Sequence, residues 1–314
     1  MINASVLRVI TAKGAGDGLL RKISSRIDEG LGYSLEEICD NQSLMCSLGI
    51  SEEVARNIYD AKDDSLRLRD ELCISGAEMC WVGDKNYPKG IKKLKNGTIP
   101  AVLFYKGNYE LVKKKCVGFT GSRKVSDSGI RITEASAKQL SENEITVVSG
   151  YAKGVDITAH RTALLEGGST IFVIVEGILK NRIKGEIREL LNDNNHLFVS
   201  QFLPKCSWSA TNAMKRNNTI IGLSDAMILI ESAMDGGTFD AGQQSLKNKK
   251  PLFVVEYAST KPSAEGNDYF LKCGGVPIRG DKNGNPILKR IYSSIEKQNI
   301  DDTYEQLKLN GFVK

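Results

Sequence analysis

The feature that most constrains this chain is a regular alternation of short apolar runs and longer mixed segments from residue 116 to residue 255. Apolar runs of four or five residues predict buried strands, and the segments of about ten residues between them predict helices. Strands and helices that alternate in this way form right-handed crossovers and a parallel sheet. The predicted strands are Cys116–Thr120, Ile145–Val148, Ile171–Val175, Leu197–Ser200, Ala226–Ile230 and Leu252–Val255, and the predicted helices lie near 128–141, 156–166, 183–193, 214–222 and 238–247. The sequence therefore predicts an α/β, Rossmann-like, doubly wound domain.

The regions on either side of this alternation predict smaller helical parts. In the first 78 residues, Ser51 is placed to cap a helix that begins with Glu52 and Glu53, and Leu48-Gly-Ile50 predicts the turn before it. A helix, a turn of this kind and a second helix are typical of a helix-hairpin-helix or a SAM-like bundle, although a plain helical cap also fits. We expect a helical domain at 1–78, the Rossmann-like domain at 79–280 and a helical C-terminal extension at 281–314.

Composition excludes several classes of protein. The longest apolar run, Ile171–Val175, ends at Glu176, and about 18 apolar residues are needed to span a bilayer. The seven cysteines form no C-x-x-C pair, and their odd number argues against a disulfide scaffold and for a reducing compartment. Only two histidines occur, which leaves little from which to build a histidine metal site. We expect a cytoplasmic protein with no secretory signal, no membrane partner and no metal.

Two glycine loops follow neighbouring predicted strands. The first contains Gly121, Ser122 and Arg123. The second contains Gly150, Lys153 and Gly154. Glycine lets the backbone approach a ligand closely, and Arg offers a bidentate fork to phosphate. Either loop alone could be a structural turn, but the pair predicts a phosphate pocket at the edge of the sheet.

A third group of polar residues stands where the helix near 214–222 is expected to begin. Lys215, Arg216 and Asn217 would then lie at a helix N-terminus, where cations oppose the helix dipole. A bound anion would offset that cost, although a surface turn with incidental charge is an alternative. Glu231 and Asp235, in a further glycine loop, are expected to orient loops rather than to touch phosphate.

No catalytic arrangement is recognisable. We expect Asp156 to cap the helix that follows it and His160, four residues later, to be a structural residue. Ser, His and acidic residues show no triad order, and neither the Walker lysine motif nor G-x-G-x-x-G is present. These observations favour a binding protein without a cofactor over an enzyme.

Positive charge is concentrated just before the first predicted parallel strand. Nine lysines and a single acid, Glu110, occur between Lys85 and Lys115, in a chain whose net charge is only +5. A basic segment next to phosphate-type loops favours a polyanion as partner. A solvated lysine-rich surface is the alternative.

Taken in order, the motifs between Gly83 and Pro277 resemble those of the DNA-processing protein A family (DprA, also called Smf). Gly121-Ser-Arg123 resembles its G-S-R motif, and the segment from Ser149 to Asp156, followed by Ala159-His160, resembles its S-G-x-A-x-G-[IV]-D…A-H signature. The remaining matches are Gly83-Asp-Lys-Asn-Tyr-Pro88, Leu103-Phe-Tyr-Lys-Gly-Asn108, Lys215-Arg-Asn217, Ile220-Ile-Gly-Leu-Ser224 and Gly266-Asn267.

The resemblance implies an extended Rossmann fold that binds single-stranded DNA, forms a homodimer and has no catalytic activity. It also implies delivery of the strand to a RecA-type recombinase in natural transformation (competence) or recombination, and it likens the N-terminal helices to a SAM-like domain. Carried over by position, Arg123 and Lys215 would contact backbone phosphate. The residues that would line the pocket are Gly121, Ser122, Gly150, Lys153, Gly154, Arg216 and Asn217. Bases could stack on Tyr151 or Phe119, although core packing is the simpler role for Phe119.

The chain also departs from the family pattern. Glu176-Gly-Ile-Leu179 replaces a G-T-G-like turn, Asn218 stands where a second arginine is common, and Asp235-Gly-Gly-Thr238 replaces S-G-[ST]. A divergent paralogue, such as a component of a defence system, is therefore an alternative. A nucleotide-binding sensor or an N-glycosidase-like enzyme of the related fold is another. The segment from Asp235 to Asp240 nevertheless lacks the Pro, the third Gly and the catalytic Glu of the phosphoribohydrolase loop P-G-G-x-G-T-x-x-E.

Overall fold

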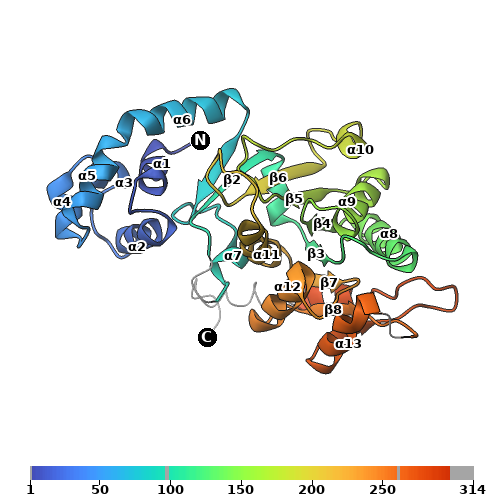
Figure 1. Ribbon diagram of the computed structural model, residues 1–314. Helices are drawn as coiled ribbons and strands as arrows, with labels where there is room; N and C mark the ends of the chain where they lie inside the picture. Colours follow the sequence, from blue (N-terminus) through green and yellow to red (C-terminus); the bar gives the residue numbers. More distant parts are fainter. Residues whose placement is uncertain (1, 96–98, 260–261, 298–314) are drawn as a thin grey trace, which may run out of the picture.

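A nine-stranded mixed sheet forms the centre of the molecule. The computed structural model describes residues 2–95, 99–259 and 262–297 (Figure 1). The strands are β1 (Glu78–Trp81), β2 (Val102–Gly107), β3 (Cys116–Thr120), β4 (Thr146–Ser149), β5 (Thr170–Val173), β6 (His196–Ser200), β7 (Ala226–Leu229), β8 (Leu252–Val255) and β9 (Val276–Ile278). Their order is β1-β2-β6-β5-β4-β3-β7-β8-β9. Strands β3 to β9 are parallel, whereas β2 runs antiparallel to β6 and β1 antiparallel to β2. The predicted α/β fold and its six parallel strands are confirmed.

The labelled helices surround this sheet on both faces and at its β2 end. They are α1 (Ala4–Thr11), α2 (Asp17–Asp28), α3 (Leu35–Cys39), α4 (Gln42–Ser47), α5 (Glu52–Asp60), α6 (Lys62–Ile74), α7 (Lys89–Lys92), α8 (Asp127–Glu142), α9 (Val155–Leu165), α10 (Gly185–Arg188), α11 (Ala210–Leu223), α12 (Gly236–Lys247) and α13 (Glu265–Lys272), with 3-10 turns η1 (Tyr109–Lys113) and η2 (Pro262–Ala264). Residues of α7, α11 and α13 share one buried cluster with β5, β7 and β8. Residues of α8 and α9 share another with β3, β4 and β9. The sheet is therefore apolar on both faces, as parallel sheets require.

The N-terminal helices share their core with the sheet. One apolar cluster runs from α1–α6 through Met79, Ala101 and Val102 to Phe104 and Phe172. The carboxylate of Asp17 on α2 accepts a hydrogen bond from the backbone N–H of Ala101 at 3.2 Å, close to the start of β2. In Figure 1 these helices lie beside the β2 end of the sheet. Within them Ser51 caps α5, as predicted, by accepting from the N–H of Val54.

Two predicted helices differ from the observed ones. The segment predicted as a helix at 183–193 contains only the four-residue α10, because asparagine side chains turn the chain after it. Asn192 Oδ1 accepts from the backbone N–H groups of Asn194 at 2.9 Å and Asn195 at 3.1 Å. Helix α11 begins at Ala210 rather than near 214, because Ser209 caps it by accepting from the N–H of Asn212 at 3.1 Å.

The end of the described chain extends this architecture. The segment from Gly266 to Pro277, for which no element was predicted, contributes to α13 and the added strand β9. Residues 289–297 are helical and bury Ile291 and Ile295 against the sheet. The rest of the predicted C-terminal extension, 298–314, lies outside the described residues. All seven cysteines are free thiols, and among the described helices none is long and apolar enough to cross a membrane.

The strand order places a crevice next to β3. From β3 the chain builds outward through β4, β5 and β6, and then returns to place β7 on the opposite side of β3. In open α/β sheets, ligands bind beyond the carboxyl ends of the strands where the order reverses in this way. In this chain that point lies between the carboxyl ends of β3 and β7.

Candidate functional site

A pocket of about 530 Å³ opens at this reversal point. It is bordered by the loops after β3, β4 and β7, by α11 residues between Ala210 and Ile220, and by the first turn of α12. Its lining residues, here called the loop pocket, are Phe119, Thr120, Gly121, Ser122, Arg123, Lys124, Ala152, Asp156, Trp208, Ala210, Ala213, Met214, Arg216, Asn217, Ile220, Glu231, Ala233, Asp235, Gly237 and Thr238. Its volume lies within the range of small-molecule sites.

The two glycine loops predicted from the sequence touch each other. The backbone N–H of Val155 donates to the carbonyl of Ser122 at 3.3 Å. Gly154 has φ of 78°, and a Cβ there would lie 2.3 Å from the same carbonyl. Only glycine satisfies both conditions, which explains the second glycine of the motif. The Ser122 N–H in turn donates to the Glu231 carbonyl at 2.9 Å, so the loops after β3, β4 and β7 are linked in one layer.

Arg216 enters the pocket from the second turn of α11 and is 6% exposed. Its Nη1 donates to the carbonyl of Val173 at 2.7 Å, and its Nε has no hydrogen-bond partner among the described residues. Burial lowers the pKa of this guanidinium, an effect that the carboxylate of Asp156 opposes and the guanidinium of Arg123 increases. Arg123 itself is exposed. Two guanidinium groups thus share one pocket, and the Nε of Arg216 is a buried donor that no described residue accepts from.

Two of the three carboxylates in the lining accept hydrogen bonds from other groups of the protein. Asp156 accepts from Ser149 Oγ at 2.9 Å, and burial raises the pKa of its carboxyl group. It lies in the first turn of α9 rather than at the predicted cap, which is Gly154. Glu231 is fully buried and accepts from the N–H of Ser126 at 2.7 Å, so it orients a loop as predicted. Asp235 is exposed. Three cations therefore face three carboxylates, of which two are held by other groups.

His160 has a structural role, as expected. It is fully buried, its Nε2 lies 2.6 Å from the carbonyl of Gly150, and its Nδ1 lies 2.5 Å from Thr170 Oγ1. Burial lowers the pKa of the imidazole to about 3, so the ring is neutral. A carbonyl can only accept, which assigns the single ring proton to Nε2. His160 thereby fixes the first glycine of the second loop.

The first turn of α12 borders the pocket. Asp235 precedes this helix but makes no side-chain capping bond, while Gly237 and Thr238 line the pocket. Asn217 of α11 holds the turn in place, because its Nδ2 donates to the Gly237 carbonyl at 3.1 Å and to Asp240 at 3.0 Å. The N-terminus of a helix attracts anions, so this turn adds a third source of positive potential beside the two arginines.

Apolar side chains complete the rim. Trp208 and Met214 line the pocket and are exposed by 55% and 38%. The sequence analysis did not identify Trp208. A tryptophan just before the helix that carries Arg216 could have indicated it. Neither candidate stacking residue presents its ring to the pocket. Phe119 is fully buried, and the Tyr151 ring packs edge-on against Phe172 with its centroid 5.3 Å away.

The structure does not bring all predicted pocket residues together. Gly121, Ser122, Arg123, Arg216 and Asn217 line the loop pocket, and Gly150 and Gly154 shape its wall. Lys153 and Lys215 are exposed outside the lining. Because α11 begins one turn early, Lys215 lies in its second turn and interacts electrostatically with Asp17 of α2. The prediction that Lys215 and Arg216 stand at a helix N-terminus is therefore wrong.

The prediction that the basic segment lies next to the glycine loops is also wrong. Lysines 113–115 precede β3, whereas the glycine loops follow the strands, so the two lie at opposite edges of the sheet. Glu176, which begins the turn that departs from the family pattern, is half-buried outside the lining and interacts electrostatically with Lys184 and Arg216.

Comparison with known proteins gives a consistent family. Residues 78–286 match the family model of the DNA recombination-mediator protein A. DNA processing protein DprA of Streptococcus pneumoniae is 30% identical over 193 residues, which cover 61% of this chain and 67% of that protein. Protein Smf of Escherichia coli is 26% identical and is matched over 64% of this chain and 57% of its own length. The alignments thus span roughly three fifths to two thirds of these relatives.

Solved structures agree on the fold. The X-ray structure of DNA processing protein A from S. pneumoniae superposes with a TM-score of 0.73 at 24% identity, over 88% of this chain and 95% of that one. DNA processing protein A from Helicobacter pylori, whose structure was described for its single-stranded DNA binding mode, gives a TM-score of 0.57 at 24% identity, over 72% and 96%. On the family match over residues 78–286 and this shared fold, the chain belongs to the DNA recombination-mediator protein A (DprA/Smf) family.

Proposed function

We propose that the chain binds single-stranded DNA in the loop pocket and acts in DNA processing and recombination. The observation that carries the proposal is the position of two guanidinium groups, those of Arg123 and Arg216, beside the exposed indole of Trp208 around one cavity. Phosphate and an unpaired base are the two parts of a nucleotide that such a combination recognises.

Each part of the pocket has a distinct task in this proposal. Arg123 and Lys124 stand at the exposed mouth and meet the backbone phosphates. Arg216 uses its unpartnered Nε on a phosphate that enters more deeply, next to the first turn of α12. Trp208 stacks on a base. A duplex keeps its bases paired and stacked inside, so it offers the indole nothing, which favours a single strand.

The family supports this assignment and adds two expectations. A relative with the same fold, DNA processing protein A from H. pylori, is described as binding single-stranded DNA. We further propose that the bound strand is passed to a RecA-type recombinase and that the protein acts as a homodimer. Light scattering of the purified chain tests the dimer. A strand-exchange assay with and without the chain tests the effect on the recombinase, and unchanged exchange would contradict that step.

The DNA-binding experiment compares Arg123→Ala with Arg290→Ala, which removes an equal charge from an exposed position outside the pocket. Fluorescence anisotropy is recorded with an oligothymidylate, a duplex of the same length and a nucleoside monophosphate over a range of salt concentrations. We expect Arg123→Ala to weaken single-strand binding about tenfold, the worth of one charge-assisted hydrogen bond, and to reduce the salt slope by about 0.7. The control should bind as the wild type does.

Two outcomes would contradict the proposal. Equal affinity in both variants and the wild type would exclude the pocket as the site of binding. Binding of the monophosphate as tight as that of the oligonucleotide would instead indicate a nucleotide sensor, and release of free base from it would indicate an enzyme.

A further inference from the structure

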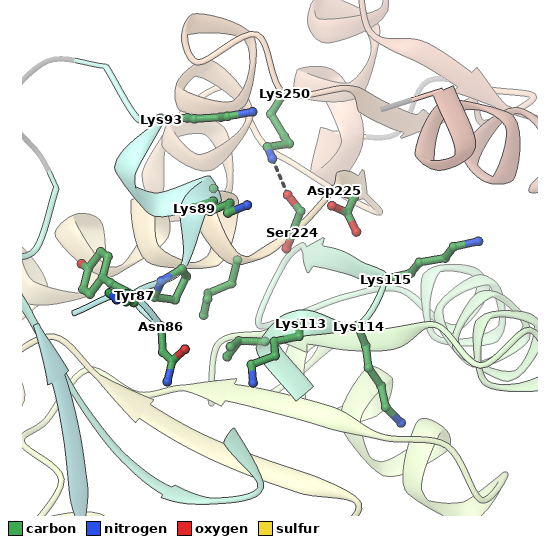
Figure 2. A pocket seen from close by; sticks show the side chains of 16 residues that line it. Asn86, Tyr87, Lys89, Lys93, Lys113, Lys114, Lys115, Ser224, Asp225 and Lys250 are labelled. Atoms are coloured by element: carbon green, nitrogen blue, oxygen red, sulfur yellow. Dashed lines mark hydrogen bonds between the residues drawn. The ribbon is translucent and has the colours of Figure 1, made fainter. Parts of the chain in front are cut away.

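A second and larger hollow lies at the opposite edge of the sheet, where the parallel strands begin. Its volume is about 810 Å³. Three segments border it: residues 85–93 around α7, residues 112–115 before β3, and residues 222–225 with Lys250 before β7 and β8. Seven of its lining residues are lysines: Lys85, Lys89, Lys93, the three lysines 113–115, and Lys250 (Figure 2). We call it the lysine hollow.

The lysine hollow carries more positive charge than the protein as a whole. Seven lysines and one aspartate give its lining a formal charge of +6, whereas the entire chain carries +5. The aspartate, Asp225, accepts a hydrogen bond from the backbone N–H of Cys116 at 2.8 Å and so serves the start of β3. Lys113 is paired with Glu110 at 2.7 Å. The basic segment noted in the sequence is thus concentrated around one concave surface.

A close helix crossing positions two of the segments that carry these lysines. Helix α7 crosses α11 so closely that a Cβ on Gly90 would lie 2.1 Å from the carbonyl of Gly222. This contact fixes Lys89 and Lys93 over the end of α11, and Figure 2 shows both on the same side of the hollow as Lys250, whose ammonium donates to the Ser224 carbonyl. Several cations around one concave surface raise its positive potential, which attracts a polyanion.

The lining favours phosphate and offers no exposed aromatic ring on which a base could stack. Lysine is a compact point charge that contacts phosphate without demanding a fixed geometry. The aromatic residue of the lining, Tyr87, is 2% exposed, and its hydroxyl donates to the carbonyl of Pro100. The lysine hollow therefore differs from the loop pocket, whose rim carries an exposed tryptophan.

We propose that the lysine hollow is a second nucleic-acid site, which grips the phosphate backbone whether or not the bases are paired. It does not depend on the loop pocket, because the two linings have no residue in common. The loop pocket takes α11 residues between Ala210 and Ile220, whereas the lysine hollow takes Gly222 and Leu223 at the end of the helix. One molecule can then hold a single strand at one edge of the sheet and a second stretch of nucleic acid, paired or unpaired, at the other.

The test removes three exposed lysines of the hollow together, in Lys85→Gln/Lys89→Gln/Lys114→Gln. The matched control, Lys272→Gln/Lys282→Gln/Lys289→Gln, removes the same charge from exposed positions outside both sites. Binding of a blunt duplex and of an oligothymidylate is measured over a range of salt concentrations. We expect the hollow variant to lose about tenfold or more of its duplex affinity and to reduce the duplex salt slope by about 2 to 3, one phosphate contact for each lysine. The control should change duplex affinity less than about twofold.

The same measurements in an Arg123→Ala/Trp208→Ala background separate this inference from the proposed function. Loss of duplex binding on removing the three lysines, with or without those loop-pocket changes, supports the lysine hollow even if the loop pocket proves not to bind DNA. Equal duplex affinity and equal salt slopes for the hollow variant and its control would overturn it. So would tight binding of inorganic tripolyphosphate at the hollow without binding of either DNA, since the ligand would then be a small oligophosphate.

Discussion

A Cβ atom on Gly150 would lie 1.9 Å from Nη1 of Arg216, closer than any two such atoms can approach. The absence of a side chain at position 150 is therefore what admits the buried guanidinium to the pocket. The carbonyl of the same glycine is held by His160 at 2.6 Å, so the wall of the pocket and its deepest cation are positioned by one residue.

Gly150→Ala should therefore damage both stability and binding. The added methyl group must displace Arg216 or Asp156, and overpacking of this kind costs about 1–3 kcal/mol. We expect single-strand affinity to fall about tenfold as Arg216 moves, since one charge-assisted contact is lost. Urea denaturation and anisotropy measure the two effects. Gly18→Ala is the control, because a Cβ there meets nothing within 4 Å inside helix α2, and it should be neutral or slightly stabilising.

Trp208→Ala should weaken binding of a single strand but not of a duplex. Stacking of one base on an aromatic ring is worth about 1–3 kcal/mol, so we expect the oligothymidylate affinity to fall by about fivefold or more. The side chain is 55% exposed, so the free energy of unfolding should hardly change. Trp208→Phe keeps a ring and should retain most of the affinity. A single-strand affinity of Trp208→Ala equal to that of the wild type would remove the indole from the site.

The buried His160 should make the protein less stable in mild acid. Its pKa is about 3 in the folded protein and about 6.5 when unfolded, so below pH 6.5 only the unfolded chain takes up the proton. The free energy of unfolding should then fall by up to about 1.4 kcal/mol per pH unit as the pH drops from 6.5 towards 3, and His160 should add no pH dependence above that range.

His160→Gln isolates this effect. It removes the titrating group, while Asp156 and His196, whose pKa values are also shifted, stay the same in both proteins. Urea denaturation near pH 7.5 and near pH 5 should show a loss of stability on acidification that is about 2 kcal/mol greater for the wild type than for the variant. Equal losses would mean that His160 is protonated in the folded state.

Asn267 should prove a strong structural residue despite its place in a family motif. Its side chain is 1% exposed and makes three hydrogen bonds at the ends of β7 and β8. It accepts from the N–H of Ser232 at 2.9 Å and donates to the carbonyls of Ile230 at 2.8 Å and Val255 at 2.9 Å.

Asn267→Asp replaces the two donors by an acceptor that faces both carbonyls. We expect the free energy of unfolding at neutral pH to fall by about 3 kcal/mol or more, since buried groups left unpaired cost about 1–3 kcal/mol each. Asn283→Ala, in an exposed turn, serves as control and should change it by less than about 0.5 kcal/mol. Similar urea midpoints for the two variants would contradict this role for Asn267.

The regular part of the fold was readable from the sequence because it depends on local pattern. Each parallel strand is a short apolar run, and each such run appears in the sheet within two residues of its predicted bounds. The limits of α10 and α11 were not readable in this way. They depend on side-chain bonds to the backbone: those of Asn192 turn the chain after α10, and that of Ser209 caps α11 one turn before the predicted start.

The loop residues of the site could be predicted from the sequence, whereas the positions of several charged side chains could not. Gly121, Ser122, Arg123 and Asn217 follow from their positions at strand ends and in motifs, and the structure places them in the pocket lining. Lys215 and Arg216 are adjacent, and only the phase of α11 decides which of the two enters the pocket. The lysines before β3 are close to Arg123 in sequence, yet a strand of five residues carries the chain to the other edge of the sheet.

The unbroken cluster that joins α1–α6 to Met79, Ala101 and Val102 sets a limit on how this protein can be divided. A shortened chain starting at Glu78 would keep every residue of both basic sites. It would also expose apolar residues of the outer strands β1 and β2 to solvent, which favours self-association. The first six helices therefore cover the apolar residues at this end of the sheet, and any fragment used to study the two sites should include them.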